Sequence, residues 1–527
     1  MKRIVVIVFF VLFLCACNEK DEHIHEYEII KYNPTCTSEG YSEYKCFCGN
    51  QYIDDIVEKI EHDYHDRICT YCNAINTNPS ENLEFILNSD HLSYSLKSIG
   101  ECEDSKVIVP STYNNLPVTS ICDNAFINNL NIKEIIIPKS INTIGKNILK
   151  GCSNLSALTS PYIYNGYIGY LFGSESSSYN NSFVPKSLKE VTITNEEKIL
   201  KNAFTNCSFL EKIFIESNVT IIENNAFYNC TGLLEITIPS TIKEIGEKAF
   251  YNCEKLLTVN FKGSYSIWFD VTLKSIYSNP MFYASYFNYC ENDIYKLLTD
   301  LIITDEVKNI NDYQLYGFDS IIGIYISQSL EYIGNESLCG LTNLEKIEVD
   351  IENNNFSSED GVLYSKDYID LICYPCAKSN VSYNVNSNTI NINDYAFSEN
   401  KYLEEIIINE KVKQIGKYAF SEMIKLKSIV IPEGVVSISE GLFFNSQNLQ
   451  YIYLPNSLTE INTSAFEYCI NLEQIFIPRN VLVIQAYAFR NCSKLSIYCE
   501  IDAKPSGWVT SYWNVYPSCP VYWNQER

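Results

Sequence analysis

The chain has 527 residues, of which 64 are acidic and 39 basic, so its formal net charge is −25. A surface with this excess of negative charge repels phosphate backbones, which excludes nucleic acid as an expected partner. It also repels anionic lipid headgroups, so the bulk of the chain should stay off a membrane surface. Hydrophobic residues make up 46% of the chain, which is enough for an extensive core.

The N-terminus has the features of an export signal. The basic pair Lys2-Arg3 precedes an apolar run, Ile4 to Leu14, that is shorter than the roughly 20 residues of a membrane-spanning helix. The run leads into Leu14-Cys15-Ala16-Cys17, which resembles the lipobox of bacterial lipoproteins. The resemblance implies a signal peptide over residues 1–17, lipidation of Cys17, and anchoring to the outer face of a membrane at the bacterial cell surface. Lipid would be the only membrane contact. A secretory signal cleaved without lipidation is the alternative.

A motif of 23 residues repeats along most of the chain. One copy reads Phe227-x-x-Cys230-x-x-Leu233-x-x-Ile236-x-Ile238-Pro239, continues through Ile245-Gly246, and ends at Ala249-Phe250, where the next copy begins. The first position of the motif is Phe or Leu at residues 126, 149, 204, 227, 250, 315, 338, 397, 420, 443, 466 and 489. Such spacing is typical of a solenoid of stacked coils.

Each part of the motif predicts a local structure. The segment Ile236-x-Ile238 alternates as a β-strand does, with the Ile side chains inward and the middle residue outward. Pro239 ends the strand, because proline has no N–H for a further ladder hydrogen bond. Gly246 allows the chain to turn, and the apolar spacing of Phe227-x-x-Cys230-x-x-Leu233 predicts a short helical turn. A single coil cannot bury its own apolar face, so stacked coils should share a core and a parallel sheet.

These residues resemble the BspA-like leucine-rich repeats of bacterial surface proteins, over residues 81–527. The resemblance implies a leucine-rich-repeat solenoid of the α/β type, with parallel strands stacked in 23-residue coils. It also implies adhesion and protein binding without enzymatic activity. Residues 315–341 depart from the pattern, because Leu replaces Phe and Cys339 is out of register.

The repeats suggest a domain organisation. We expect residues 81–500 to form the solenoid, and insertions to bulge from it near residues 161–188, 262–300 and 350–380, each a candidate contact loop. We expect linkers at residues 18–22 and 76–80 and a small Cys/His module at residues 23–75. An aromatic C-terminal cap is expected at residues 501–527. The cap should cover the open end of the solenoid. A sugar-binding aromatic patch is the alternative there.

The cysteines of the repeats are expected to be core residues. Six of them share the third position after the repeat Phe, where a thiol behaves as a small hydrophobic group: Cys152, Cys207, Cys230, Cys253, Cys469 and Cys492. Six equivalent positions favour packing over pairing. Cys499 and Cys519, both near the cap, are better candidates for a disulfide.

A second group of cysteines is concentrated in the small module. Five cysteines and four of the chain's five histidines lie there, and a segment this short needs a staple to fold: Cys36, Cys46, Cys48, Cys69, Cys72, His23, His25, His62 and His65. The Cys-x-Cys and Cys-x-x-Cys spacings favour tetrahedral zinc, held by the cysteines with His62 or His65. The run from Pro34 to Gly49 resembles small zinc-ribbon-like repeats of bacterial surface proteins. Disulfides are the alternative, because the module is expected outside the membrane.

The composition of the repeats disfavours catalysis. No histidine follows His91, which excludes Ser-His-Asp and Cys-His chemistry in the solenoid. No Gly-rich phosphate loop or metalloprotease helix motif is present. We therefore predict that the chain is not an enzyme.

The outward residue of the strand motif is the candidate binding position. It is apolar in four consecutive coils, at Ile407, Val430, Tyr453 and Phe476, and these side chains should form one column on the sheet. A contiguous exposed apolar patch often marks a partner site. Strand propensity alone, or an insertion that covers the column, would explain the same residues.

The expected function is that of a cell-surface adhesin that binds an extracellular or host protein, with a glycan as a second kind of partner. A structural or scaffolding envelope lipoprotein is the first alternative. A polysaccharide-acting surface enzyme is the second.

Overall fold

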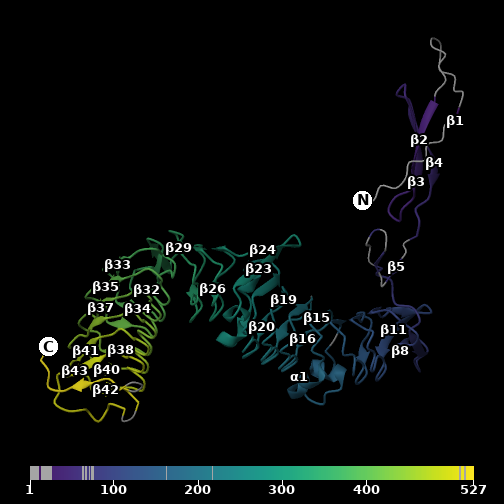
Figure 1. The fold of residues 1–527 in the computed structure, drawn as a ribbon. Helices are drawn as coiled ribbons and strands as arrows, with labels where there is room; N and C mark the ends of the chain where they lie inside the picture. Colours follow the sequence, from purple (N-terminus) through teal and green to yellow (C-terminus); the bar gives the residue numbers. More distant parts are fainter. Residues whose placement is uncertain are drawn as a thin grey trace.

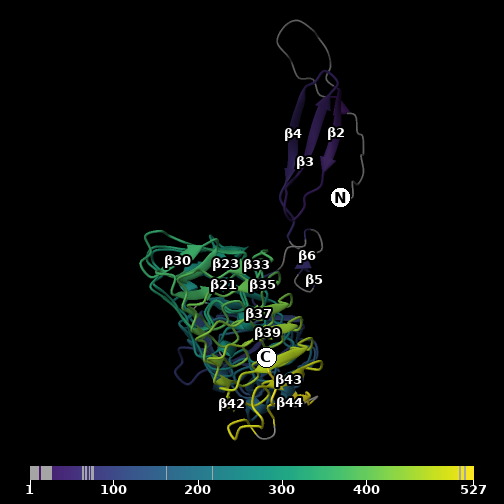
Figure 2. The ribbon, with the colours of Figure 1, turned by 90° about the vertical axis from the view of Figure 1, so that its left-hand side faces the viewer.

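The computed structural model of the protein describes residues 11–12, 26–61, 64–65, 68–69, 72, 76–161, 163–216, 218–509, 512–514 and 518–526. The repeats stack into an arch, as Figure 1 shows, and the N-terminal strands project from one end of it. Figure 2 shows the same strands standing clear of the coils in the perpendicular view. No helix within these described residues is long and apolar enough to cross a membrane.

The projecting module is an antiparallel sheet. Its strands follow in chain order, β1 (Val11–Leu12), β2 (Glu26–Tyr32), β3 (Gly40–Cys46) and β4 (Gln51–Val57). A two-stranded pair, β5 (Tyr64–His65) and β6 (Ile68–Cys69), follows it. Few of its side chains are buried, and every residue of β4 is exposed.

One strand of each coil contributes to a parallel array that we call the long-strand ladder. Its first part runs through β9 (Lys106–Ile108), β12 (Glu134–Ile136), β14 (Ala157–Ser160), β15 (Glu190–Ile193), β17 (Lys212–Ile215), β19 (Glu235–Pro239), β21 (Thr258–Lys262) and β23 (Tyr286–Glu291). A three-stranded part follows, with β25 (Asp300–Ile303), β27 (Gly323–Ile326) and β29 (Lys346–Val349). The last part holds β33 (Ser382–Asn384), β35 (Glu405–Ile407), β37 (Ser428–Val430), β39 (Tyr451–Tyr453), β41 (Gln474–Ile477), β43 (Ser496–Cys499) and β44 (Val521–Tyr522). The predicted parallel sheet is thus confirmed, in three parts.

A second strand of each coil, two residues long in most coils, forms the short-strand ladder. It comprises β16 (Lys198–Ile199), β18 (Ile221–Ile222), β20 (Glu244–Ile245) and β22 (Thr272–Leu273); β26 (Asn309–Ile310) and β28 (Tyr332–Ile333); β32 (Asp370–Cys373), β34 (Asn391–Ile392) and β36 (Gln414–Ile415); and β38 (Ser437–Ile438), β40 (Glu460–Ile461) and β42 (Val483–Ile484). It lies toward the inner side of the arch in Figure 1. The N-terminal end is closed by β7 (Glu84–Leu87), β8 (Tyr94–Ser98), β10 (Thr112–Tyr113), β11 (Leu116–Ile121) and β13 (Thr143–Ile144).

The core between the ladders is a stack of equivalent side chains. The repeat Phe rings lie one above the next, with centroid separations such as 5.2 Å between Phe227 and Phe250 and 5.3 Å between Phe466 and Phe489. Cys230 Sγ donates to the carbonyl of Phe204 at 3.1 Å, and the same contact recurs for Cys152, Cys253, Cys469 and Cys492. These thiols are buried packing groups, as their shared position predicts.

The segment that carries the Phe differs from expectation. It consists of hydrogen-bonded turns and not of the predicted short helix, because two positions of the segment have left-handed backbone geometry. In the coil of Phe227 these are Asn225 and Asn229, with φ of 58° and 59°. A residue with positive φ interrupts an α-helix, and Asn tolerates this geometry better than most residues do.

The insertions are more buried than expected. Residues 161–188 form η1 (Tyr164–Gly166), η2 (Ile168–Phe172), η3 (Ser177–Tyr179) and α1 (Asn180–Phe183), and Ile168, Leu171 and Phe172 pack into the core. In residues 262–300, Trp268 of α2 (Tyr265–Trp268) is buried against Phe287, and η4 (Ile276–Ser278) and η5 (Pro280–Phe282) follow. The prediction that these segments bulge outward is wrong for these side chains.

Two parts of the insertions do form hairpins. Antiparallel pairing joins β23 to β24 (Ile294–Leu297), whose residues are all exposed. In residues 350–380, β30 (Phe356–Glu359), β31 (Val362–Ser365) and β32 form a meander. Its first turn is Asp360-Gly361, with φ of 49° and 75°, as the hairpin signal predicts.

Candidate functional site

The long-strand ladder places the four predicted binding residues side by side. Val430 of β37 is paired with Tyr453 of β39, and the neighbouring pairs Ile406 with Ile429 and Tyr451 with Gln474 continue the register to Ile407 and Phe476. The exposed fractions are 53% for Ile407, 61% for Val430 and 46% for Tyr453, and Phe476 is half-buried. These side chains therefore line the outer face of the sheet.

The structure extends this column by two aromatic residues. The Phe476 ring stacks on Tyr498 at 5.0 Å, and Tyr498 stacks on Tyr522 at 5.1 Å. Tyr498 follows Phe476 by 22 residues and precedes Tyr522 by 24, so a strict 23-residue period misses Tyr498 but returns to register at Tyr522. We call the set Ile407, Val430, Tyr453, Phe476, Tyr498 and Tyr522 the apolar column.

The inward neighbours of the column are not equally buried. Ile475 is fully buried, whereas Ile452, which alternation places inward, is half-buried. Ile452 lies on β39, whose pairing with β41 is reduced to Tyr451 and Gln474. Both Ile side chains point inward, but Ile452 only packs against the core that includes Ile475.

In two coils of the N-terminal part, the outward position is polar and buried. Thr237 and Asn260 occupy the outward position there, and both are almost fully buried. The Asn260 amide donates to Glu235 at 2.6 Å, and the Asn288 amide donates to Asn260 at 2.8 Å. The β23–β24 hairpin lies close by, since burial and then the charges of Cys290 and Glu235 raise the pKa of Tyr295. These two coils therefore lack the exposed apolar outward residue that the coils of the apolar column carry.

Three cysteines of the N-terminal module come together. The sulfur atoms of Cys36, Cys69 and Cys72 lie within 4.8 Å of one another, and this group could hold a metal ion. Cys36 Sγ lies 3.6 Å from Cys69 Sγ, close to the roughly 3.8 Å between two sulfur ligands of a tetrahedral zinc ion with Zn–S bonds of about 2.3 Å. Burial, and then the neighbouring thiols, raise the pKa of Cys36 to about 12. A bound cation would favour the thiolates.

The other two cysteines of the predicted set lie at a turn. Cys46 ends β3, and hydrogen bonding from the Cys48 backbone lowers the pKa of Cys46. Among the described residues, the group of sulfur atoms that could share an ion includes neither of them. His23, His25 and His62 lie outside the described residues, and the side chain of His65 is not described.

The remaining predicted sites lie at the ends of the chain. Cys499 and Cys519 are both buried near the C-terminus, and Cys519 Sγ contacts the carbonyl of Cys492 at 3.5 Å. Their pairing stays a prediction. Cys17 lies outside the described residues, so its lipidation also stays a prediction. In the cap, Trp508 is buried and packs against Trp513 and Trp523, at 5.0 and 5.7 Å.

Parallel strands stacked with a 23-residue period around a ladder of Phe rings define a leucine-rich-repeat solenoid. The chain belongs to the family described as the BspA type leucine rich repeat region, which matches residues 81–191, 176–292, 272–365 and 367–496 in six copies. No curated protein matches the chain.

Several solved structures are similar in fold. A leucine-rich cell surface protein from Faecalibacterium prausnitzii is 23% identical, with 82% of this chain and 94% of that chain covered and a TM-score of 0.42. The pneumococcal vaccine antigen PcpA is 18% identical, with coverage of 84% and 90% and a TM-score of 0.38. A leucine-rich repeat protein from Bacteroides ovatus is 20% identical, with coverage of 80% and 100% and a TM-score of 0.33.

Proposed function

We propose that this protein is a non-catalytic adhesin of the bacterial cell surface, and that it binds an extracellular or host protein through the apolar column. The observation that carries the proposal is the exposure of Ile407, Val430 and Tyr453 in one uninterrupted row. Apolar side chains that stay in contact with water in adjacent coils form the kind of patch that a partner covers. Their exposure supports a contact role over a packing role.

The geometry of the aromatic residues favours a protein over a glycan on this face. Phe476, Tyr498 and Tyr522 stack against one another with interplanar angles of 18°, so the faces of the middle ring are occupied. Such stacked rings present edges to solvent. A sugar ring packs on a free aromatic face, whereas an apolar protein surface packs against edges and methyl groups alike.

The negative charge of the chain disfavours the scaffold alternative. A formal net charge of −25 makes close packing of identical copies repulsive. A partner with a neutral or basic surface is the better fit. The absence of histidine beyond His91 supports a non-catalytic role.

Binding of the full chain to immobilised collagen, laminin and fibronectin tests the proposal. The variant Val430→Ser/Tyr453→Ser removes two paired, exposed apolar side chains, and binding to whichever protein the parent binds should fall at least tenfold. The matched control is Ile302→Ser/Tyr325→Ser. These residues are also paired on the long-strand ladder, with exposed fractions of 51% and 38%, but lie outside the column. Equal binding by both variants would contradict the proposal.

We also propose that a lipid anchors the N-terminal module and that a zinc ion stabilises its fold. Lipidation of Cys17 would hold the N-terminus at the membrane, and zinc at Cys36, Cys69 and Cys72 would hold the module together, with His62 or His65 as candidate fourth ligands. The clustering of the three sulfur atoms supports the zinc proposal. Zinc sites of this kind commonly supply much of the folding free energy of small domains.

A further inference from the structure

A cleft of about 910 Å³ opens at the middle of the arch, where the short-strand ladder is interrupted. β28 pairs with β26, and the next strand of this ladder, β32, pairs with β34. Among the described strands, no pairing joins β28 to β32, so the ladder has a gap at this point. The volume falls in the range of ligand sites in proteins, about 300–1,000 Å³. The cleft draws on some of the same coils as Ile407 and Val430, but its lining includes no residue of the apolar column.

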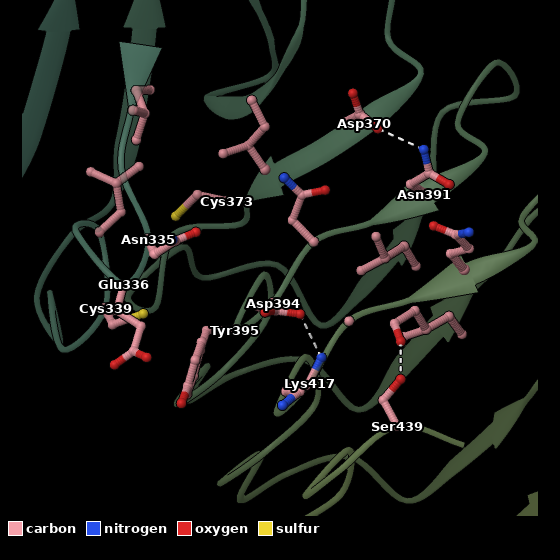
Figure 3. A pocket seen from close by; sticks show the side chains of 18 of the residues that line it. Asn335, Glu336, Cys339, Asp370, Cys373, Asn391, Asp394, Tyr395, Lys417 and Ser439 are labelled. Carbon is pink, nitrogen blue, oxygen red and sulfur yellow. Dashed lines mark hydrogen bonds between the residues drawn. The ribbon is translucent and has the colours of Figure 1, made fainter. Parts of the chain in front are cut away.

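The walls of the cleft carry groups that form hydrogen bonds. Carboxylates, carboxamides and a phenol ring face it from both sides of the interruption, as Figure 3 shows for Glu336, Asp370, Asn335, Asn391 and Tyr395. Glu336 comes from the coil before the gap, and Tyr395 comes from a coil after it. Such a lining suits a ligand with many hydroxyl groups, because carboxylates accept from hydroxyls and carboxamides both donate and accept.

Tyr395 is placed as a platform. One face of its ring stacks on Tyr418 at 5.2 Å with an interplanar angle of 9°, and the residue is half-buried. Tyr418 thus supports the ring from one side, and Tyr395 itself lines the cleft. Burial, and then the charge of Glu336, raise the pKa of Tyr395, so the phenol stays neutral and close to that carboxylate.

Not every carboxylate in the cleft is available to a ligand. Asp394 accepts the backbone N–H of Lys417 at 2.7 Å, and Asp123 accepts that of Lys146 in the same way. This contact belongs to the repeat and occurs in coils without a cleft. Among the described residues, the Glu336 carboxylate does not take part in this repeated contact with a backbone N–H. Burial, and then the charges of Asp394 and Asp312, raise the pKa of Glu336.

We propose that the cleft binds a neutral oligosaccharide, with a sugar ring on Tyr395 and hydrogen bonds from its hydroxyls to Glu336 and Asn391. Aromatic faces beside hydroxyl-binding polar groups fit the two sides of a pyranose, one apolar and one polar. The lining holds three carboxylates against two lysines, Lys413 and Lys417, and the net charge of the chain is −25, so sialylated or uronic-acid chains are disfavoured. The residues of this site are not those of the apolar column, so the experiments on the two sites test the two proposals independently.

The repeat itself provides substitutions that should leave the fold intact. Glu336 and Tyr395 both have positive φ, 50° and 59°, two residues before the first motif position. In several other coils the equivalent residue is asparagine, for example Asn202 and Asn225. Tyr395→Asn and Glu336→Asn therefore place in the cleft a residue that the same turn already accepts elsewhere. Tyr487, at the equivalent position with φ of 61° but away from the cleft, provides the matched control Tyr487→Asn.

Saturation-transfer NMR on the full chain tests the proposal, with maltotriose, cellotriose and chitotriose as neutral probes and 3′-sialyllactose as the charged counterpart. We expect at least one neutral trisaccharide, and not the sialylated one, to receive magnetisation. Tyr395→Asn and Glu336→Asn should each weaken that binding at least tenfold, and Tyr487→Asn should leave it unchanged. Binding by none of the neutral probes, or binding that survives both cleft variants, overturns the proposal. Thermal unfolding of each variant shows that a loss of binding is not a loss of fold.

Discussion

Val430 and Tyr453 lie directly opposite each other on neighbouring parallel strands, and both side chains are exposed to solvent. Their substitution by serine removes no core contact. We therefore expect Val430→Ser/Tyr453→Ser to change the free energy of unfolding by no more than about 1 kcal/mol. Chemical denaturation monitored by circular dichroism measures this, and a larger loss would mean that the column is part of the core.

The inward neighbours should behave differently from the column and from each other. Ile475 is fully buried, so Ile475→Ala should lower the free energy of unfolding by roughly 2–5 kcal/mol through loss of contacts and a residual cavity. Ile452 is only half-buried, and the same substitution there should have a smaller effect. The two denaturation midpoints decide this. Equal losses would place Ile452 in the core, as alternation alone suggests.

Sequence periodicity predicted the coil and the parallel ladder because each copy carries the same apolar pattern. It also predicted the hairpin at Asp360-Gly361, whose turn chemistry is local. It did not predict Tyr498 in the column, because the coil between Phe476 and Tyr498 is one residue shorter than the period, although the rings still stack. Periodicity also did not predict the burial of Trp268, because Trp268 lies in an insertion and its contact with Phe287 is not part of the repeat pattern.

The candidate sites were harder to predict than the fold. Five cysteines in one module suggested a metal site, but only the folded chain separates Cys46 and Cys48 from the cluster of Cys36, Cys69 and Cys72. The cleft left no signal in the sequence, because it arises where one insertion interrupts a ladder. Its residues, such as Glu336 and Tyr395, come from different coils and share only the turn position.

The metal proposal predicts a stoichiometry. Elemental analysis of the full chain, purified under reducing conditions without chelator, should show about one zinc ion for each set of three clustered thiolates. Cys36→Ser should lower the zinc content sharply. Cys230→Ser, which alters a buried thiol of the repeat core, should not change it. Metal-free protein, or equal zinc content in both variants, would favour disulfides in the module.

The repeat cysteines should tolerate serine better than alanine. Ser446 occupies the cysteine position in its own coil and donates to the carbonyl of Phe420 at 2.6 Å, as Cys469 does to Phe443 at 3.1 Å. The Phe443 carbonyl also accepts the backbone N–H of Ser446 at 3.0 Å. Cys469→Ser keeps the second donor to this carbonyl, whereas Cys469→Ala removes it, at a loss of about 0.5–1.5 kcal/mol. Thermal unfolding of the two variants measures the difference. A less stable serine variant would show that thiol packing, and not the hydrogen bond, dominates.

Membrane anchoring rests on one residue. Cys17→Ser should abolish lipid modification and move the protein out of the detergent phase after partitioning of expressing cells. The parent and a Cys15→Ser variant should stay in that phase, because Cys15 lies ahead of the expected lipidation site. Unchanged partitioning of Cys17→Ser would contradict the lipoprotein interpretation.

Photo-cross-linking tests most directly whether the apolar column is the contact surface. A benzophenone amino acid at position 430, within the column, should form an adduct with the matrix protein that the parent chain binds. The same group at position 302, which is similarly exposed on the long-strand ladder, should form none. An adduct at 302 alone, or none at 430 while binding persists, would contradict the account.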